Sequence, residues 1–166
     1  MEKQNSRINS LVLGSILTWA LVAAPAYAAG PISLHPENPH YFLLRGKPTV
    51  LITSGEHYGA VLNLDFDYVR YLDELQKNDL NLTRTFSGFY PEILGAFNIP
   101  DNTLAPAGGR YLAPWARSST PGAADGGNKF DLTKWDEAYF RRLKDFLGEA
   151  GKRGIVVELT MLNVIY

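Results

Sequence analysis

The chain has 166 residues, three histidines, no cysteine and a formal net charge of −1 at neutral pH. The absence of cysteine excludes disulfide bonds, thiol catalysis and cysteine-ligated zinc or iron–sulfur sites. Because the basic residues are dispersed and the charge is near zero, neither a nucleic acid nor an anionic membrane surface is indicated as a partner.

Residues 1–28 have the pattern of a bacterial secretory signal peptide. A short basic region precedes an apolar run over residues 11–24, and Ala26-Tyr27-Ala28 supplies a cleavage motif. The run is shorter than the roughly 20 residues that a membrane-spanning helix needs. We therefore expect cleavage near Ala28 and a secreted or periplasmic protein whose residues 29–166 belong to one domain, with an uncleaved membrane anchor as the alternative.

Two apolar runs around a glycine turn open the mature chain. Residues 41–44 and 48–52 flank Arg45-Gly46-Lys47, which predicts a hairpin. We expect its second arm to continue as a buried strand over residues 49–53. A polar loop bounded by glycines follows at residues 54–59.

A first helix is expected over residues 65–77, with Asn63 or Asp65 as its N-cap. Its apolar face is formed by residues at helical spacing, namely Tyr68, Val69, Leu72 and Leu75. A buried strand over residues 80–86 comes next and carries Arg84. Because a guanidinium stays charged at ordinary pH, a buried Arg84 requires an anionic partner.

Residues 91–129 are rich in glycine and proline and have no sustained period, so we expect a long loop that is either functional or disordered. A second helix starts near Asp136 and is expected to end at a left-handed Gly151. Its predicted apolar face consists of Tyr139, Phe140, Leu143, Phe146, Leu147 and Ala150. Residues 155–161 then predict an apolar strand that is buried on both faces.

Strands that alternate with helices predict an α/β fold with a parallel sheet. About three strands and two helices would leave an apolar sheet edge open. A (β/α)8 barrel takes about 250 residues. We therefore expect the truncated N-terminal part of a TIM (β/α)8 barrel, preceded by the hairpin, with a self-contained small α/β domain as the alternative.

A series of short motifs runs through the mature sequence in a distinctive order. They are His35-Pro-Glu-Asn-Pro-His-Tyr-Phe42, Arg45-Gly-Lys-Pro48, Ser54-Gly-Glu-His57, Asn81-Leu-Thr-Arg84, Phe130-Asp-Leu-x-x-Trp135 and Ala150-Gly-Lys-Arg-Gly-Ile155. In this order they resemble the start of cellulase-like glycoside hydrolases of the retaining (β/α)8 clan. The resemblance covers nearly all of the mature chain, and the order of the motifs carries it more than any one of them.

The resemblance implies a retaining mechanism with two glutamates, an acid/base after the fourth strand and a nucleophile at the end of the seventh. Both positions would lie beyond Tyr166. Arg84 matches the arginine that supports the nucleophile in this clan, and a structural ion pair with a core acid is its alternative role. Many relatives carry a histidine after the third strand, whereas residues 161–166 contain none.

Candidate substrate-binding residues are selected because barrel active sites lie at the carboxyl ends of the strands. They are Glu56, His57, Tyr90, Trp115 and Asn163. The Glu56-His57 pair could hydrogen-bond a sugar hydroxyl, and Tyr90, Tyr111 or Trp115 could stack on a pyranose face. A role in stabilising or packing the loops is the alternative for these five residues, and Asn163 could be a hydrogen-bonding group in the cleft. We interpret Glu158 as a structural ion-pair partner of Arg84 rather than as a catalytic acid.

The sequence therefore predicts an exported glycoside hydrolase that acts on a polysaccharide or oligosaccharide. Neither a cofactor nor a metal is expected, because dinucleotide, Walker and Gly-x-Ser-x-Gly motifs are missing and the histidines form no ligand pair on a strand. A non-catalytic carbohydrate-binding or surface protein on the same scaffold is the alternative function.

Overall fold

The computed structural model describes residues 32–53 and 57–161. The predicted signal peptide lies outside these residues. Within the described ranges, none of the helices has the length and apolar character needed to cross a bilayer.

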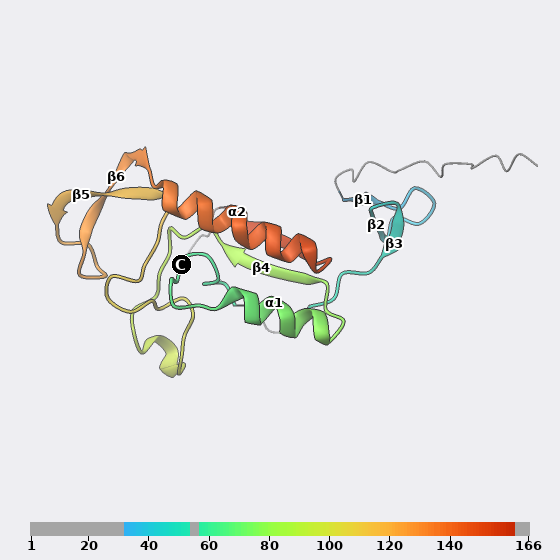
Figure 1. Ribbon diagram of the computed structural model, residues 1–166, viewed down its shortest axis with the longest axis horizontal. Coiled ribbons are helices and arrows are strands. Elements are labelled where there is room, and N and C mark those ends of the chain that lie inside the picture. The colour runs from blue at the N-terminus through green and yellow to red at the C-terminus, as the bar shows by residue number, and fades with distance from the viewer. Residues whose placement is uncertain (1–31, 54–56, 162–166) are drawn as a thin grey trace, which may run out of the picture.

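A small antiparallel sheet begins the described chain. Its strands are β1 (Ser33–Leu34), β2 (Phe42–Leu44) and β3 (Lys47–Thr49), paired in that order. Arg45 and Gly46 have φ angles of 51° and 75°, as a tight two-residue hairpin turn requires. The predicted hairpin is confirmed, and Figure 1 shows this sheet at one end of the molecule.

The predicted strand over residues 49–53 is wrong, because β3 ends at Thr49. The following residues still run beside the next strand of the chain, but the side chain of Asn81 takes up part of their backbone hydrogen-bonding capacity. Its Oδ1 accepts from the amide of Ile52 at 2.7 Å, and its Nδ2 donates to the carbonyl of Val50 at 2.8 Å. This side-chain bridging replaces a regular ladder.

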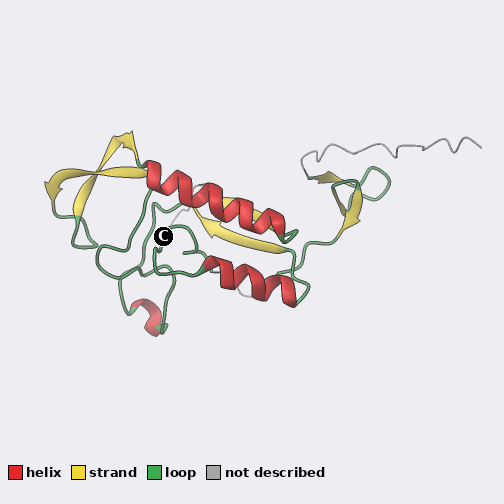
Figure 2. Cartoon of the chain, in the orientation of Figure 1, coloured by secondary structure: helices red, strands yellow, loops and turns green. Residues whose placement is uncertain are grey.

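Two parallel strands and two helices form the central body. β4 (Leu82–Phe86) pairs with β7 (Val156–Thr160), while α1 (Tyr68–Lys77) and α2 (Glu137–Lys152) pack against each other. In Figure 2 both helices lie alongside β4. The core between helices and strands contains Ala60, Val61, Leu72, Leu75, Leu112, Tyr139, Phe146, Ala150 and Ile155.

Alternation along β4 separates two faces of this sheet. Thr83 and Thr85 are fully buried, and the hydroxyl of Thr83 shares a hydrogen bond of 2.7 Å with that of Tyr71 on α1. Leu82, Arg84 and Phe86 are half-buried and point to the opposite face. The helices therefore cover the threonine face, and Arg84 lies on the other one.

The first helix is confirmed but begins at Tyr68, later than expected. Asp67 is its N-cap and accepts from the amide of Arg70 at 3.0 Å. Asn63 instead accepts from the amide of Asp65 and forms a turn ahead of the helix. Leu72 and Leu75 are buried as predicted, whereas Val69 is exposed.

The second helix is also confirmed, and Asp136 caps it by accepting from the amide of Ala138 at 2.8 Å. The prediction that Gly151 ends it is wrong, because the helix continues through Lys152 and Gly154 takes the left-handed conformation with φ 73°. The predicted apolar face is wider than the buried stripe. Tyr139, Phe146 and Ala150 are buried, while Phe140 and Leu147 are exposed.

The segment over residues 91–129 is more ordered than expected. It contains the short helix η1 (Ala96–Asn98) and β5 (Trp115–Pro121), which pairs antiparallel with β6 (Asn128–Trp135). This hairpin projects at the opposite end of the molecule from β1–β3 (Figure 1). The expectation of a long loop holds for residues 91–114 apart from η1, and it is wrong from Trp115 onward.

The last strand departs from expectation in its burial. β7 runs from Val156 to Thr160 with half-buried residues around an exposed Glu158, so it is not buried on both faces. The structure shows a mixed α/β fold with a parallel β4–β7 pair and, within the described part of the chain, open sheets.

Candidate functional site

Arg84 and Glu158 occupy directly paired positions of β4 and β7. The guanidinium donates to the carboxylate at 2.9 Å, so the predicted ion pair is confirmed. The expectation of a buried arginine is wrong, since the two side chains are 38% and 49% exposed. They stand on the sheet face that the helices leave open.

Hydrogen bonds link the carboxyl end of β4 to that of β7 and to Tyr58, in the segment before α1. The amide of Phe86 donates to the carbonyl of Tyr58 at 3.0 Å, and the hydroxyl of Ser87 donates to the carbonyl of Met161 at 3.1 Å. The rings of Tyr58 and Phe86 stack with centroids 4.5 Å apart. An aromatic pair and a charged pair thus share one surface near the strand ends.

His57 lies on the other side of the sheet. Its ring packs against Phe66 at 5.4 Å and edge-on against Tyr71 at 5.0 Å between centroids. Tyr71 belongs to α1 and reaches Thr83, which faces the helices. The structure therefore does not bring His57 together with Arg84. Glu56 and Asn163 lie outside the described residues.

The aromatic candidates are likewise dispersed. Trp115 stacks on Trp135 with ring centroids 6.4 Å apart, beside an apolar cleft of about 380 Å³. Tyr111 donates its hydroxyl to the carbonyl of Gly88, and burial raises its pKa above the ordinary value. Tyr90 is half-buried, four residues after β4.

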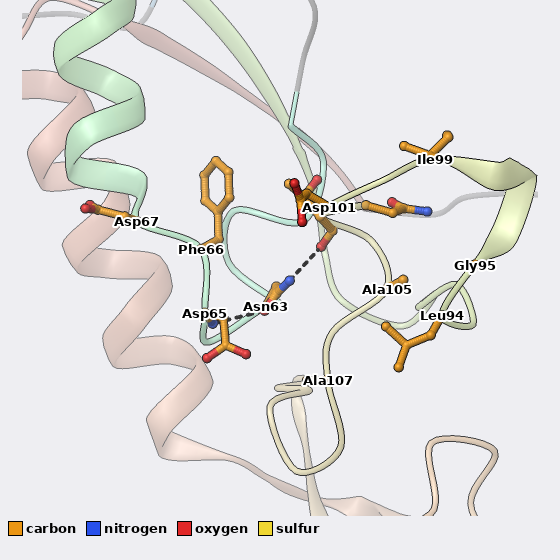
Figure 3. A pocket seen from close by; sticks show the side chains of 12 residues that line it. Asn63, Asp65, Phe66, Asp67, Leu94, Gly95, Ile99, Asp101, Ala105 and Ala107 are labelled. Atoms are coloured by element: carbon orange, nitrogen blue, oxygen red, sulfur yellow. Dashed lines mark hydrogen bonds between the residues drawn. The ribbon is translucent and has the colours of Figure 1, made fainter.

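A larger polar pocket of about 540 Å³ lies between two connections of the chain, residues 63–67 before α1 and residues 94–107 after β4 (Figure 3). Its lining consists of Asn63, Asp65, Phe66, Asp67, Leu94, Gly95, Ile99, Asp101, Asn102, Thr103, Ala105 and Ala107. None of the residues predicted as site residues is among them. Because α1 runs back from the end where β4 finishes, the pocket lies toward the carboxyl edge of the sheet, where α/β folds bind ligands.

The pocket has two walls, a first wall of residues 63–67 and a second wall of residues 94–107, and Asn63 joins them. Its side chain is buried, donates to the carbonyl of Thr103 at 3.2 Å and accepts from the amide of Asp65 at 3.0 Å. The first of these bonds links the two connections, and both are drawn in Figure 3. On the second wall, Asn102 donates to Glu92 at 2.5 Å. The walls are therefore fixed by hydrogen bonds.

Three carboxylates give the pocket its charge. Asp65 pairs with Arg110 at 2.6 Å, and Asp67 caps α1. Asp101 is exposed and, among the described residues, makes neither a hydrogen bond nor an ion pair. Arginine, lysine and histidine are absent from the described lining.

The second helix holds the first wall in place through Arg142. Its guanidinium donates to four backbone carbonyls, at 2.9–3.0 Å, which belong to Ala60, Val61, Asn63 and Phe66. It also lies over the ring of Tyr68, 4.7 Å from the centroid. One side chain thus contacts the backbone of a whole turn and is a second donor to the carbonyls of Asn63 and Phe66, which also accept from the amides of Phe66 and Tyr68.

Sequence reasoning treated Asn63 and Asp65 only as helix caps and gave no role to Asp101 or Asn102. The polar run Asp101-Asn102-Thr103 inside a loop was the available signal. What the sequence could not supply was the second wall, because the contact between Asn63 and Thr103 spans 40 positions of the chain.

Comparison with known proteins shows a similarity of fold. No protein-family model and no curated protein matches the sequence. Among solved structures, the chain is similar to a crystal structure from Bacteroides vulgatus described as a "putative glycoside hydrolase", with a TM-score of 0.55 and 18% identity. The match covers 83% of this chain and 25% of that chain, so this chain spans about a quarter of its length. At this identity the likeness concerns the fold.

Proposed function

We propose that this chain is part of the catalytic domain of a secreted glycoside hydrolase that cleaves O-glycosidic bonds in a polysaccharide or oligosaccharide. The observation that carries the proposal is the fold similarity to the Bacteroides vulgatus protein over 83% of the chain. The order of motifs along residues 35–155, which resembles cellulase-like glycoside hydrolases, supports the proposal independently of that similarity.

The proposed architecture is a (β/α)8 barrel in which β4 and β7 are neighbouring strands. The sheet face that carries Arg84 and Glu158 would then line the interior of the barrel. The open state of that face and the parallel pairing of the two strands are both compatible with this arrangement. Residues 29–166 would be the N-terminal part of the domain.

The proposed chemistry is retaining hydrolysis by two glutamates supplied by polypeptide beyond residue 166. Carboxyl groups about 5 Å apart suit a covalent glycosyl-enzyme intermediate. Arg84 would support the nucleophile, because a guanidinium beside a carboxylate keeps it ionised and oriented. Glu158 would fix the direction of Arg84 from the neighbouring strand, across the 2.9 Å ion pair.

Substrate contacts are proposed for Glu56, Tyr90, Trp115 and Asn163, whereas the ring of His57 packs against Phe66 and Tyr71 on the helix side of the sheet. The stacked pair of Trp115 and Trp135 offers one aromatic surface of the kind that pyranose rings contact. No cofactor is required by this reaction.

Hydrolysis by the product of the complete reading frame tests the proposal. The assay follows the release of reducing ends from β-glucan, xylan and mannan and the anomeric configuration of the first product by proton NMR. We expect hydrolysis with retention, and a kcat at least tenfold lower in Arg84→Lys, since lysine lacks the planar guanidinium fork. Arg141→Lys, a change of an exposed arginine on α2, is the matched control.

The possible outcomes separate the two candidate functions. Binding of polysaccharides without hydrolysis would favour a carbohydrate-binding protein on the same scaffold. Hydrolysis with inversion would contradict the covalent mechanism. Secretion is tested separately by N-terminal sequencing of the exported protein, which we expect to begin just after Ala28.

A further inference from the structure

The polar pocket between residues 63–67 and residues 94–107 has the dimensions of a ligand site. Its volume of about 540 Å³ falls within the roughly 300–1,000 Å³ that small-molecule sites occupy. Both walls belong to connections rather than to regular elements, and such connections carry most binding residues in α/β folds. The size of the pocket admits one or two sugar rings.

Contacts within the protein hold the two pocket walls together. The bond from Asn63 to the carbonyl of Thr103 joins the walls, and the amide of Glu92 donates to the carbonyl of Leu104 at 2.7 Å behind the second wall. Gly59 approaches the backbone of Thr103 too closely to admit a side chain. Fixed walls lower the ordering cost of binding.

The lining combines two kinds of surface. Asp65, Asp67 and Asp101 belong to the lining, and their carboxylates are hydrogen-bond acceptors. Phe66, Leu94 and Ile99 add apolar surface. Hydroxyl groups that donate hydrogen bonds, attached to a ring with apolar C–H faces, match both kinds of surface.

The negative charge of the lining further restricts the class of ligand that the pocket can bind. Arg110 compensates Asp65, but it is not itself a lining residue, and the described lining carries no cation. An anionic ligand would meet Asp101 without a compensating charge in the described lining, and like charges in one site repel each other. Acidic sugars are therefore disfavoured.

From these observations we infer that the pocket binds a neutral sugar ring of the substrate and discriminates against uronic acids. This inference rests on the proposed function, and it adds a position and a charge preference to it. Asp101 is the residue that we assign to hydroxyl recognition, because its carboxylate is exposed at the pocket and is not engaged by another described residue.

Nitrogen-15 NMR titration of the product of the complete reading frame, purified after export, tests the inference. The probes are xylotriose and cellotriose as neutral trisaccharides, trigalacturonate as the acidic one, and calcium chloride. We expect the neutral trisaccharides to shift the amides of Asn63, Asp101 and Thr103. Trigalacturonate at the same concentration should leave them in place.

Two variants locate the binding. Ala107→Trp fills the pocket from an exposed lining position and should weaken trisaccharide binding more than tenfold. Asp101→Asn removes the charge, and we expect roughly threefold to tenfold weaker binding of the neutral probes together with less discrimination against trigalacturonate. Circular dichroism checks the fold of both variants.

Asp79→Asn is the matched control for the change at Asp101. Both aspartates are exposed and have left-handed backbone conformations, with φ of 57° and 53°, and asparagine tolerates this region. Asp79 follows α1, whereas the pocket lies before that helix. The control should bind trisaccharides like the unchanged protein.

Several results would overturn the inference. These are absence of trisaccharide binding, shifts confined to other parts of the chain, stronger binding of trigalacturonate, or pocket shifts with calcium alone. If the complete protein hydrolyses polysaccharides but trisaccharides do not shift the pocket amides, this inference fails and the proposed function stands. If the pocket binds neutral trisaccharides but no hydrolysis occurs, the proposed hydrolase function fails, while the position of the sugar site and its charge preference are retained.

Discussion

A Cβ atom on Gly59 would stand only 1.9 Å from the carbonyl oxygen of Thr103. The two residues belong to different connections of the chain, one before α1 and one after β4. The same carbonyl accepts the hydrogen bond from Asn63, and the amide of Asn63 donates to Gly59 at 2.9 Å. Contact at Gly59 thus sets the separation of the two pocket walls.

Replacing Gly59 by alanine should push Thr103 away and destabilise the protein. The overlap is with backbone rather than with a flexible side chain, so the connection itself must move. Overpacking of this kind costs about 1–3 kcal/mol. Urea denaturation measures the loss, and the amide signal of Thr103 should shift in the NMR spectrum.

Gly108→Ala is the control, because a Cβ atom there meets nothing within 4 Å. Its unfolding free energy should change by no more than about 0.5 kcal/mol. Equal effects of the two substitutions would show that the close contact between Gly59 and Thr103 does not constrain the fold.

Arg142 should be the most sensitive charged residue among those that support the pocket. In Arg142→Met the aliphatic stem remains, but four backbone carbonyls lose their charged donor. We expect a loss of about 2–4 kcal/mol in the free energy of unfolding, measured by urea denaturation. Hydrogen exchange should also accelerate in residues 60–66.

The neighbouring residue supplies the matched control for this substitution. Arg141 is exposed on the same helix, so Arg141→Met should change stability by less than about 0.5 kcal/mol. A small effect at Arg142, equal to that at Arg141, would mean that the loop keeps its conformation without the guanidinium.

The ion pair between Arg84 and Glu158 should contribute little to stability, since both side chains are partly exposed. A double-mutant cycle with Arg84→Met and Glu158→Gln should give a coupling energy below about 1 kcal/mol. The coupling should weaken as sodium chloride is added, because salt screens exposed charges. Denaturant titrations of the four proteins measure it.

Lys77 and Glu74 form a more exposed pair at 3.5 Å, and the same cycle on them should give a coupling near zero. A coupling of several kcal/mol at Arg84 would contradict the partly exposed geometry. If hydrolytic activity of the complete protein falls far more than stability in Arg84→Met, the arginine acts on another group besides Glu158.

Local signals in the sequence were sufficient for the helices and for the first hairpin. Asp136 preceding an amphipathic run identified the start of α2, and Arg45-Gly46 identified a turn that needs positive φ. The strand over residues 49–53 failed because the side chain of Asn81 replaced the ladder. The β5–β6 hairpin was missed because its register depends on distant pairs such as Trp115 with Trp135.

The candidate site shows the same contrast between features that local sequence signals predict and features that depend on long-range contacts. The pairing of Arg84 with Glu158 was predictable, because parallel strands place residues of the same face side by side. The polar pocket was not predictable, since its walls meet through Asn63 and Thr103 in a contact that no local pattern encodes. Long-range contacts between irregular segments therefore limit what the sequence reveals of the site.

Acidification should weaken the β5–β6 hairpin through Asp125. Its carboxylate accepts hydrogen bonds from both terminal nitrogens of Arg117. The same guanidinium lies 3.9 Å from the centroid of the Phe130 ring. Burial acts to raise the pKa of Asp125, but the hydrogen bonds and charge of Arg117 outweigh it, and the pKa lies below its ordinary value. The ion pair is therefore maintained down to a lower pH than an isolated aspartate would allow.

The pKa of Asp125 is lower in the folded state than its unfolded value of about 3.9. The ion pair with Arg117 therefore stabilises the fold fully above about pH 3.9. It is lost as the pH falls through the folded-state value. The stability difference between the unchanged protein and Asp125→Asn, from urea denaturation at pH 6, 4 and 3, should therefore be constant at first and then shrink. In an Arg117→Met background the pH dependence of this difference should largely disappear. A difference that grows on acidification would contradict the depressed pKa.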